Sequence, residues 1–110
     1  MDLTQQKRNI AVKLIRPSNR KINVFRCSGG ESEAHKKAKE EQCNILRKEN
    51  KHFITEAIFS DSDLRADVFV LDDFKIIEIA VSETEKSLQR KRDICNKINL
   101  KMVVIRCQKN

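Results

Sequence analysis

Residues 65–81 read RADVFVLDDFKIIEIAV, and two β-branched runs in this stretch flank the polar pair Asp72 and Asp73. Short apolar runs on either side of a polar turn are typical of an antiparallel hairpin, so we predict strands over 66–71 and 75–81. This hairpin decides the fold, because its register fixes which residues of the two strands lie side by side.

Two acids lie within the hairpin. A two-residue turn places Asp67 directly opposite Glu78, whereas a four-residue loop opposes Asp67 to Ala80, which shares the face of Glu78 because side chains alternate along a strand. Two carboxylates that project together from an apolar sheet are costly unless a cation lies between them, and such oxygen ligands suit Mg²⁺ or Mn²⁺. The alternative is that Asp67 caps a turn or pairs with Arg65, and that Glu78 forms an ion pair with Lys75 or another base on the sheet.

The flanking sequence predicts the rest of the core. A stretch rich in Ala, Glu and Lys over 31–50 predicts a helix, and FITEAIF at 53–59 predicts a strand. After the hairpin, a second helix is predicted to begin at Ser82 and to end at Asn99, followed by a strand at 101–107. A strand, a helix and a further strand require a crossover, so the last strand should run parallel to an earlier one.

The amino-terminal quarter is predicted to be a basic hairpin. The runs NIAVKLI at 9–15 and KINVFR at 21–26 are β-type and flank the turn-like sequence RPSNR. A length of 110 residues suits one hydrophobic core. We therefore predict a single α/β domain over 1–110, with a β-hairpin extension over 1–28 and an αβββαβ core with a mixed sheet over 29–107.

The positive charge is concentrated at the amino terminus. The chain has a net charge of +7, and its first 26 residues hold seven bases and one acid. Such a surface fits a nucleic-acid backbone, because neutralising phosphates releases condensed counterions. The alternative is a solvated face that keeps the protein soluble. The candidate phosphate contacts are Lys13, Arg16, Arg20 and Lys21 in the predicted hairpin and Arg90 and Lys91 in the second predicted helix.

Other features exclude several classes of protein. The four cysteines form no CxxC pair and the chain has two histidines, so zinc-finger spacing is absent, and we expect reduced, buried thiols. The longest apolar stretch, at 76–81, is far too short for a membrane span. The amino terminus lacks the apolar segment of a secretory signal, so we expect an intracellular, cytoplasmic protein without a membrane partner.

The predicted topology and its acids resemble a known family. An acid in the first helix (Glu33 in GESEAHKKAKEE), one at the start of the second strand (Asp67 in RADVFV) and one in the third (Glu78 in IIEIAV) together resemble the PD-(D/E)XK nuclease superfamily. Its members include restriction endonucleases and archaeal Holliday-junction resolvases. The resemblance covers roughly residues 30–107 and implies a restriction-endonuclease-like core.

The resemblance also implies roles for these acids. Asp67 and Glu78 would be the ligands of Mg²⁺, or of Mn²⁺, and Glu33 would be a supporting catalytic acid. In that family a lysine two residues after the glutamate orients or activates the attacking water, but the corresponding residue here is Ala80, whose methyl group can do neither. Family lysines are known to migrate into the second helix, so Lys86 is our preferred catalytic substitute.

The function predicted on this resemblance is a Mg²⁺-dependent endonuclease that hydrolyses phosphodiester bonds of duplex or branched DNA as a homodimer. The retained acids favour this enzyme. Ala80 favours the alternative, a catalytically degenerate nuclease-fold protein that binds nucleic acid or a protein partner without cleaving. An RNA-recognition sheet ranks last, because such sheets stack bases on exposed aromatic residues and this chain has no Trp or Tyr.

Overall fold

The computed structural model describes residues 2–107 and has the αβββαβ element order predicted for 29–107, with one further helix before it. The elements are the helices α1 (Leu3–Val12), α2 (Glu33–Lys48) and α3 (Glu85–Lys97) and the strands β1 (Phe53–Ile58), β2 (Arg65–Val70), β3 (Lys75–Ala80) and β4 (Lys101–Arg106), with short 3-10 helices at Pro17–Asn19 and Leu71–Asp73. The sheet order is β1-β2-β3-β4. β2 runs antiparallel to both neighbours, and β4 is parallel to β3 as the crossover requires.

The central hairpin has the register predicted for a two-residue turn. The turn closes with a hydrogen bond from the Phe74 N–H to the Leu71 carbonyl, and Phe74 adopts a left-handed backbone conformation with φ 48°. Continuing this register places Asp67 across from Glu78. The observed partners are Val68 with Ile77, Phe69 with Ile76, and Val70 with Lys75.

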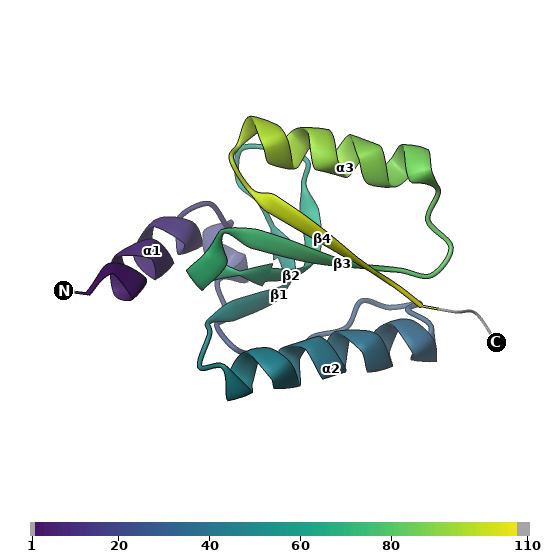
Figure 1. The fold of residues 1–110 in the computed structure, drawn as a ribbon, viewed down its shortest axis with the longest axis horizontal. Coiled ribbons are helices and arrows are strands. Elements are labelled where there is room, and N and C mark those ends of the chain that lie inside the picture. The colour runs from purple at the N-terminus through teal and green to yellow at the C-terminus, as the bar shows by residue number, and fades with distance from the viewer. Residues whose placement is uncertain (1, 108–110) are drawn as a thin grey trace.

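Helices cover both faces of the sheet. α2 lies on one face and α3 on the other, as Figure 1 shows. Successive side chains of β3 alternate between the two cores, because Ile76 packs on the α3 side and Ile77 on the α2 side. Cys95 of α3 and Cys43 of α2 are fully buried, one in each core, and burial raises the pKa of both thiols to about 11. Cys27, in contrast, is exposed.

The ends of the two core helices follow local capping. The Ser32 side chain accepts the His35 N–H at the start of α2, close to the predicted start. α3 begins later than predicted, because Thr84 rather than Ser82 is its N-cap and accepts the Ser87 N–H. None of the helices within residues 2–107 has the length and apolar character needed to cross a membrane.

The predicted β-hairpin over 1–28 is wrong. Its first half is mostly the helix α1, where the Asp2 side chain caps the helix by accepting the Gln5 N–H. Ala11 of α1 is fully buried in the α3-side core, and Ile15, which lies beyond the end of α1 and forms a β-bridge with Phe59, is buried in the same core. A short apolar run fits a helix or a strand equally well, and here packing on the sheet decides for the helix.

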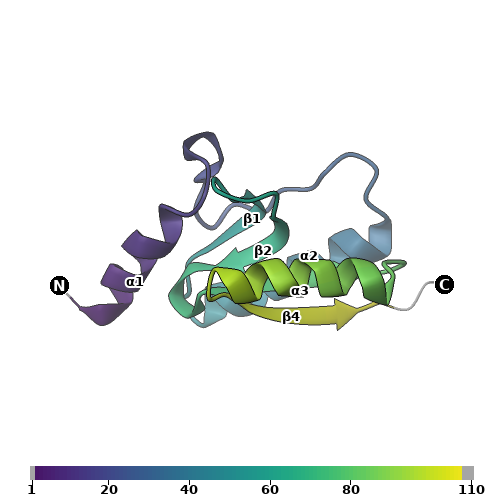
Figure 2. The same ribbon diagram turned by 90° about the horizontal axis from the view of Figure 1, so that it is seen from above.

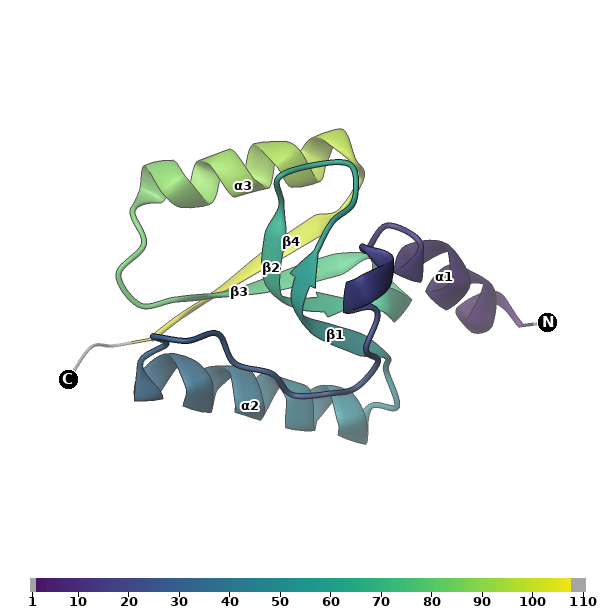
Figure 3. The ribbon, with the colours of Figure 1, turned by 180° about the vertical axis from the view of Figure 1, so that it is seen from behind.

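The second half of the predicted hairpin is extended but pairs with a different partner. Asn23 donates its N–H to the Phe53 carbonyl at 2.8 Å, and Arg26 donates its N–H to Thr55 Oγ1 at 2.9 Å. This segment therefore lies beside β1 and covers the edge of the sheet, as can be followed in Figure 3. Figure 2 shows α1 projecting from one end of the molecule, away from this segment.

Candidate functional site

The regular alternation of side chains breaks at Asp67. Ala66 and Phe69 of β2 both contribute to the α3-side core although they are three residues apart, whereas Val68 packs on the α2 side. On the neighbouring strand, Glu56 has φ 51°, a left-handed conformation that is rare for a residue with a side chain. Asp67 is directed toward α2, on the opposite side from the one that strict alternation from Val68 would give.

Asp67 occupies the space between two strands and a helix. Its Oδ2 accepts the Ile79 N–H of β3 at 2.8 Å and lies 3.3 Å from Nε2 of His35 in α2. The carboxylate thus replaces a backbone partner for β3 and retains some contact with solvent, since the side chain is 19% exposed. The Asp67 carboxylate therefore lies at the surface of the protein and is accessible to solvent, rather than being enclosed in the hydrophobic core.

Glu78 is the more deeply buried of the two strand acids. Its Oε2 accepts the Asp67 N–H at 2.8 Å, and its Oε1 pairs with the Lys91 ammonium of α3, which also donates to the Arg65 carbonyl at 3.2 Å. Burial, followed by the nearby Asp67 charge, raises the pKa of Glu78, while Lys91 opposes the shift.

The predicted shared face of the two carboxylates is therefore wrong. Asp67 and Glu78 lie across from each other on adjacent strands, as expected, but Asp67 is turned to His35 of α2 and Glu78 to Lys91 of α3. The physical reason is the break in alternation at Asp67, which follows from a backbone distortion and not from the residue pattern. The two acids remain close enough for the Asp67 charge to affect the pKa of Glu78.

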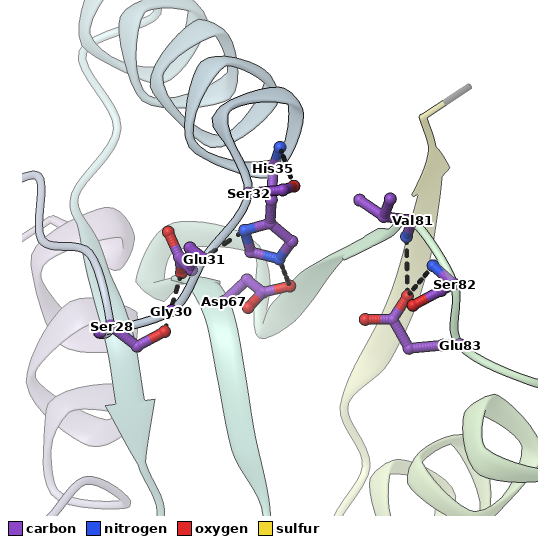
Figure 4. A pocket seen from close by; sticks show the side chains of 10 residues that line it. Ser28, Gly30, Glu31, Ser32, His35, Asp67, Val81, Ser82 and Glu83 are labelled. Atoms are coloured by element: carbon purple, nitrogen blue, oxygen red, sulfur yellow. Dashed lines mark hydrogen bonds and ion pairs between the residues drawn. The ribbon is translucent and has the colours of Figure 1, made fainter. Parts of the chain in front are cut away.

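A second group of charged side chains surrounds Asp67 on the α2 side (Figure 4). Glu31 precedes α2, and its Oε1 lies 3.4 Å from Nδ1 of His35. Lys39 is fully buried, with its Nζ 2.6 Å from Glu31 Oε1 and 3.6 Å from Glu56 Oε2. Burial alone would raise the pKa of Glu31, but Lys39, with smaller contributions from His35 and the Ser28 backbone, holds it below its usual range.

Glu31, His35 and Asp67 line an open cavity of about 370 Å³. The two glycines before α2 and the loop after β3 form the remainder of its wall. At Gly29 and Gly30 a Cβ would meet no atom within 4 Å, so the wall beside these glycines is open. The loop after β3 places Glu83 on the other side of the cavity, where its carboxylate accepts the Val81 and Ser82 N–H groups.

The structure does not bring the remaining predicted catalytic residues to this cavity. The Glu33 side chain is 94% exposed and lies 3.6 Å from Lys36. Lys86 is exposed and lines a different surface cavity along α3. The cation that the structure places beside Glu78 is Lys91, which was predicted from the sequence to bind phosphate. Ala80 is 3% exposed.

The residues nearest Asp67 were not predicted from the sequence. Glu31, His35 and Lys39 are spaced by four residues, and this spacing puts side chains on one face of a helix. This spacing was the one sequence signal that these three side chains lie together. Polar residues at such positions, however, are more typical of a solvent-exposed helix face. Glu56 carried no signal, because its orientation depends on the distorted backbone of β1.

The predicted phosphate contacts are mostly accessible. Lys13, Arg16, Lys21 and Arg90 are exposed. Arg20 is also exposed but donates to the Ile15 carbonyl at 2.8 Å, so it stabilises the turn after α1.

Comparison of the chain with protein-family models, with curated proteins and with solved structures finds no match.

Proposed function

We propose that the protein is a Mg²⁺- or Mn²⁺-dependent endonuclease that hydrolyses phosphodiester bonds of DNA. The observation that carries the proposal is the opening between β2 and β3, where Asp67 and Glu78 exchange hydrogen bonds with each other's strands and Lys91 reaches Glu78. An acid pair of which Asp67 lines an open cavity, with an ammonium adjacent to Glu78, supplies the side-chain types that metal-assisted phosphodiester hydrolysis uses.

The residues present fit a divalent cation. Asp67 offers a partly exposed carboxylate at the cavity wall, and Glu31 has a buried oxygen, Oε2, without a hydrogen-bond partner. A bound divalent ion lowers the pKa of a coordinated water and neutralises charge on a phosphate. Asp67 would hold such an ion. Glu78, fixed by Lys91, would be the second acid of the pair that PD-(D/E)XK nucleases carry on these two strands.

Lys91 supports the proposal in the place of the absent strand lysine. It lies on the same side of the sheet as Glu78 and Ala80, because residues two apart in β3 share a face. In hydrolysis the water oxygen forms a bond to phosphorus and its proton leaves to a carboxylate or to solvent, while the bond to the sugar oxygen breaks and that oxygen takes up a proton from solvent to leave as a hydroxyl. Lys91 lies beside Glu78 on the α3 side, whereas Asp67 lines the cavity on the α2 side, so the ammonium would act by favouring the charged form of Glu78.

A cleavage assay tests the proposal. Purified full chain should cut duplex or branched DNA with Mg²⁺ or Mn²⁺ and not with EDTA. Asp67→Asn should lower the rate by about 10² or more, because it removes a charged ligand while keeping the size of the side chain. Glu33→Gln is the matched control and should cleave like the unmodified protein, since Glu33 is exposed away from the cavity. Cleavage that survives Asp67→Asn would contradict the proposal.

One observation favours a second function, nucleic-acid binding without cleavage. Glu78 is 3% exposed and already paired with Lys91, and Ala80 provides no lysine at the usual position. A degenerate nuclease would bind DNA through its basic surface and show no metal-dependent cleavage in any variant.

The proposed homodimer would give an active enzyme two sites, one for each strand, and sedimentation of the full chain with and without DNA measures the oligomeric state.

A further inference from the structure

Glu31 and His35, four residues apart around the start of α2, meet Asp67 of β2 on the α2 side of the sheet. One possible ligand atom from each lies within 4.8 Å of the others. Glu31 Oε1 lies 3.4 Å from His35 Nδ1 and Asp67 Oδ2 lies 3.3 Å from His35 Nε2, so the imidazole lies between the two carboxylates, and a single ion would take one of its two ring nitrogens. Metal–ligand bonds of about 2.0–2.2 Å give ligand pairs separated by about 3 Å.

Two buried polar atoms of this group lack a hydrogen-bond partner. Glu31 Oε2 is one, in a side chain that is only 6% exposed, and His35 Nδ1 is the other. Buried polar atoms are normally satisfied, and each exception calls for a specific explanation such as a bound ion. Because these two atoms belong to neighbouring side chains that line one cavity, a single ion bound among them accounts for both.

The side chains around the group carry more negative than positive charge, which favours the binding of a cation. Glu31, Glu56 and Asp67 contribute three carboxylates, whereas Lys39 is the ammonium in contact with them. Lys39 is fully buried and therefore fixes Glu31 in place rather than reaching the cavity. With the imidazole of His35 neutral, as in a metal ligand, a divalent ion would balance the charge.

We propose that Glu31, His35 and Asp67 together bind one divalent transition-metal ion such as Mn²⁺. This proposal deepens the proposed function and rests on it for the role of the ion in cleavage. The imidazole nitrogen gives the site a preference for Mn²⁺ over Mg²⁺, because Mg²⁺ binds mainly oxygen ligands. The open cavity leaves coordination positions for water or a phosphate oxygen, and Glu78 remains outside the ligand set, paired with Lys91.

Titration of the full chain with Mn²⁺, followed by the electron paramagnetic resonance signal of the free ion, tests this ligand set. We expect one Mn²⁺ per chain, with at least about tenfold weaker binding of Mg²⁺ in competition. His35→Gln should weaken Mn²⁺ binding at least about tenfold, the lower end of the loss typical even for residues that only support a metal ligand. Glu33→Gln on the same helix is the matched control and should bind like the unmodified protein.

A control experiment must distinguish a loss of metal binding from a loss of folding. Glu31→Gln removes a partner of buried Lys39 and is compared only if its far-ultraviolet circular dichroism is unchanged. His35→Gln leaves that pair intact and is the decisive variant. In the unmodified protein, the spin echo of bound Mn²⁺ should carry the modulation of a coordinated imidazole nitrogen, and this modulation should vanish in His35→Gln. Unchanged Mn²⁺ binding in His35→Gln, or no nitrogen modulation, overturns the proposal.

The same titration separates failure of this proposal from failure of the proposed function. If Asp67→Asn and Glu78→Gln lose Mn²⁺ binding while His35→Gln retains it, the ion is held by the two strand acids, and the ligand set proposed here is wrong while the nuclease proposal stands. If His35→Gln loses Mn²⁺ binding but the unmodified protein never cleaves DNA, the ligand set is supported and the nuclease proposal fails.

Discussion

Glu78 Oε2 accepts the Asp67 backbone N–H at 2.8 Å, and the Asp67 carboxylate in turn accepts the Ile79 N–H at 2.8 Å. Two side chains thus replace backbone partners where β2 and β3 pass beyond their last pair, Val68 with Ile77. Both carboxylates are fixed by backbone donors, so their positions depend little on side-chain flexibility. Lys91, the cation beside Glu78, is therefore a side chain whose removal should directly change the stability of the folded protein.

Lys91→Met should lower the free energy of unfolding by about 1–3 kcal/mol at neutral pH, because it leaves a buried carboxylate without its cation. The pKa of Glu78 is raised by burial and by the Asp67 charge, so ionised Glu78 destabilises the folded protein. As pH falls through that raised pKa, Glu78 takes up a proton and the deficit of Lys91→Met should shrink. Urea unfolding followed by circular dichroism, at neutral and at mildly acidic pH, measures both effects.

Lys86→Met is the matched control for this experiment. Lys86 is exposed on the same helix, so its replacement should change stability by no more than about 0.5 kcal/mol at either pH. Equal losses of stability for the two variants, or a Lys91→Met deficit that grows in acid, would contradict the assigned pair.

The core could be predicted from the sequence because its signals are local. The Asp72-Asp73 turn set the register of the hairpin, and the crossover rule set the parallel direction of β4. The amino terminus could not be assigned in this way, since the apolar run at 9–15 fits either a helix or a strand. In the structure the run is divided: Ala11 packs in the core from α1, which ends at Val12, and Ile15 forms a β-bridge with Phe59.

The sequence predicted only part of the candidate site, because the rest depends on a break in the alternation of side chains. Strand pairing placed Asp67 across from Glu78, but Asp67 departs from the alternation of its strand at a point where Glu56 of the adjacent strand has a left-handed backbone. A glutamate in a β-type run gives no sign of such a backbone, so no residue pattern marks the break. His35 and Glu31 therefore became neighbours of Asp67 through tertiary structure alone.

Asp72→Asn should loosen α1 and lower the free energy of unfolding by about 1–2 kcal/mol at neutral pH, through loss of charge-assisted hydrogen bonds. Arg8 donates from Nε to Oδ1 and from Nη2 to Oδ2, each at 2.9 Å, and the His52 N–H donates to Oδ1 at 3.0 Å. Faster hydrogen exchange in α1 should accompany the destabilisation. Asp61→Asn, in an exposed loop, is the control and should change neither quantity.

The Asp72 contribution also has a defined pH dependence. Burial alone would raise the pKa of Asp72, but the Arg8 hydrogen bonds and the His52 N–H outweigh burial and hold it below its usual range. A lowered pKa in the folded state stabilises the protein above the unfolded-state pKa, and this stabilisation disappears as pH falls through the folded-state pKa. The difference between the unmodified protein and Asp72→Asn should therefore be constant near neutrality and disappear in strong acid. A difference that widens in acid would contradict this assignment.

Lys39→Met should be the most destabilising of these substitutions, at about 3–5 kcal/mol, because removing one member of a buried ion pair leaves the other uncompensated. Lys39 is fully buried between Glu31 and Glu56. Adding Glu31→Gln to Lys39→Met should recover part of the stability, since it removes one unpaired charge. Thermal unfolding of the two single variants and the double variant measures this coupling, and Lys37→Met, exposed on the same helix, should be nearly neutral. Strict additivity would exclude a direct pair.

Replacing Lys13, Arg16 and Lys21 together with Gln should weaken DNA binding and reduce its dependence on salt, by about one unit of logarithmic slope for each phosphate that is no longer neutralised. All three are exposed near the amino terminus, whereas Arg20 is left unchanged because it donates to the Ile15 carbonyl. Fluorescence anisotropy of labelled duplex DNA over a range of salt concentrations measures the slope. The control removes the same charge from exposed positions on α2 and α3, as Lys37→Gln, Lys48→Gln and Lys97→Gln. Equal slopes for the two triple variants would show that net charge alone governs binding, and an unchanged slope in the first would assign its charges to solubility.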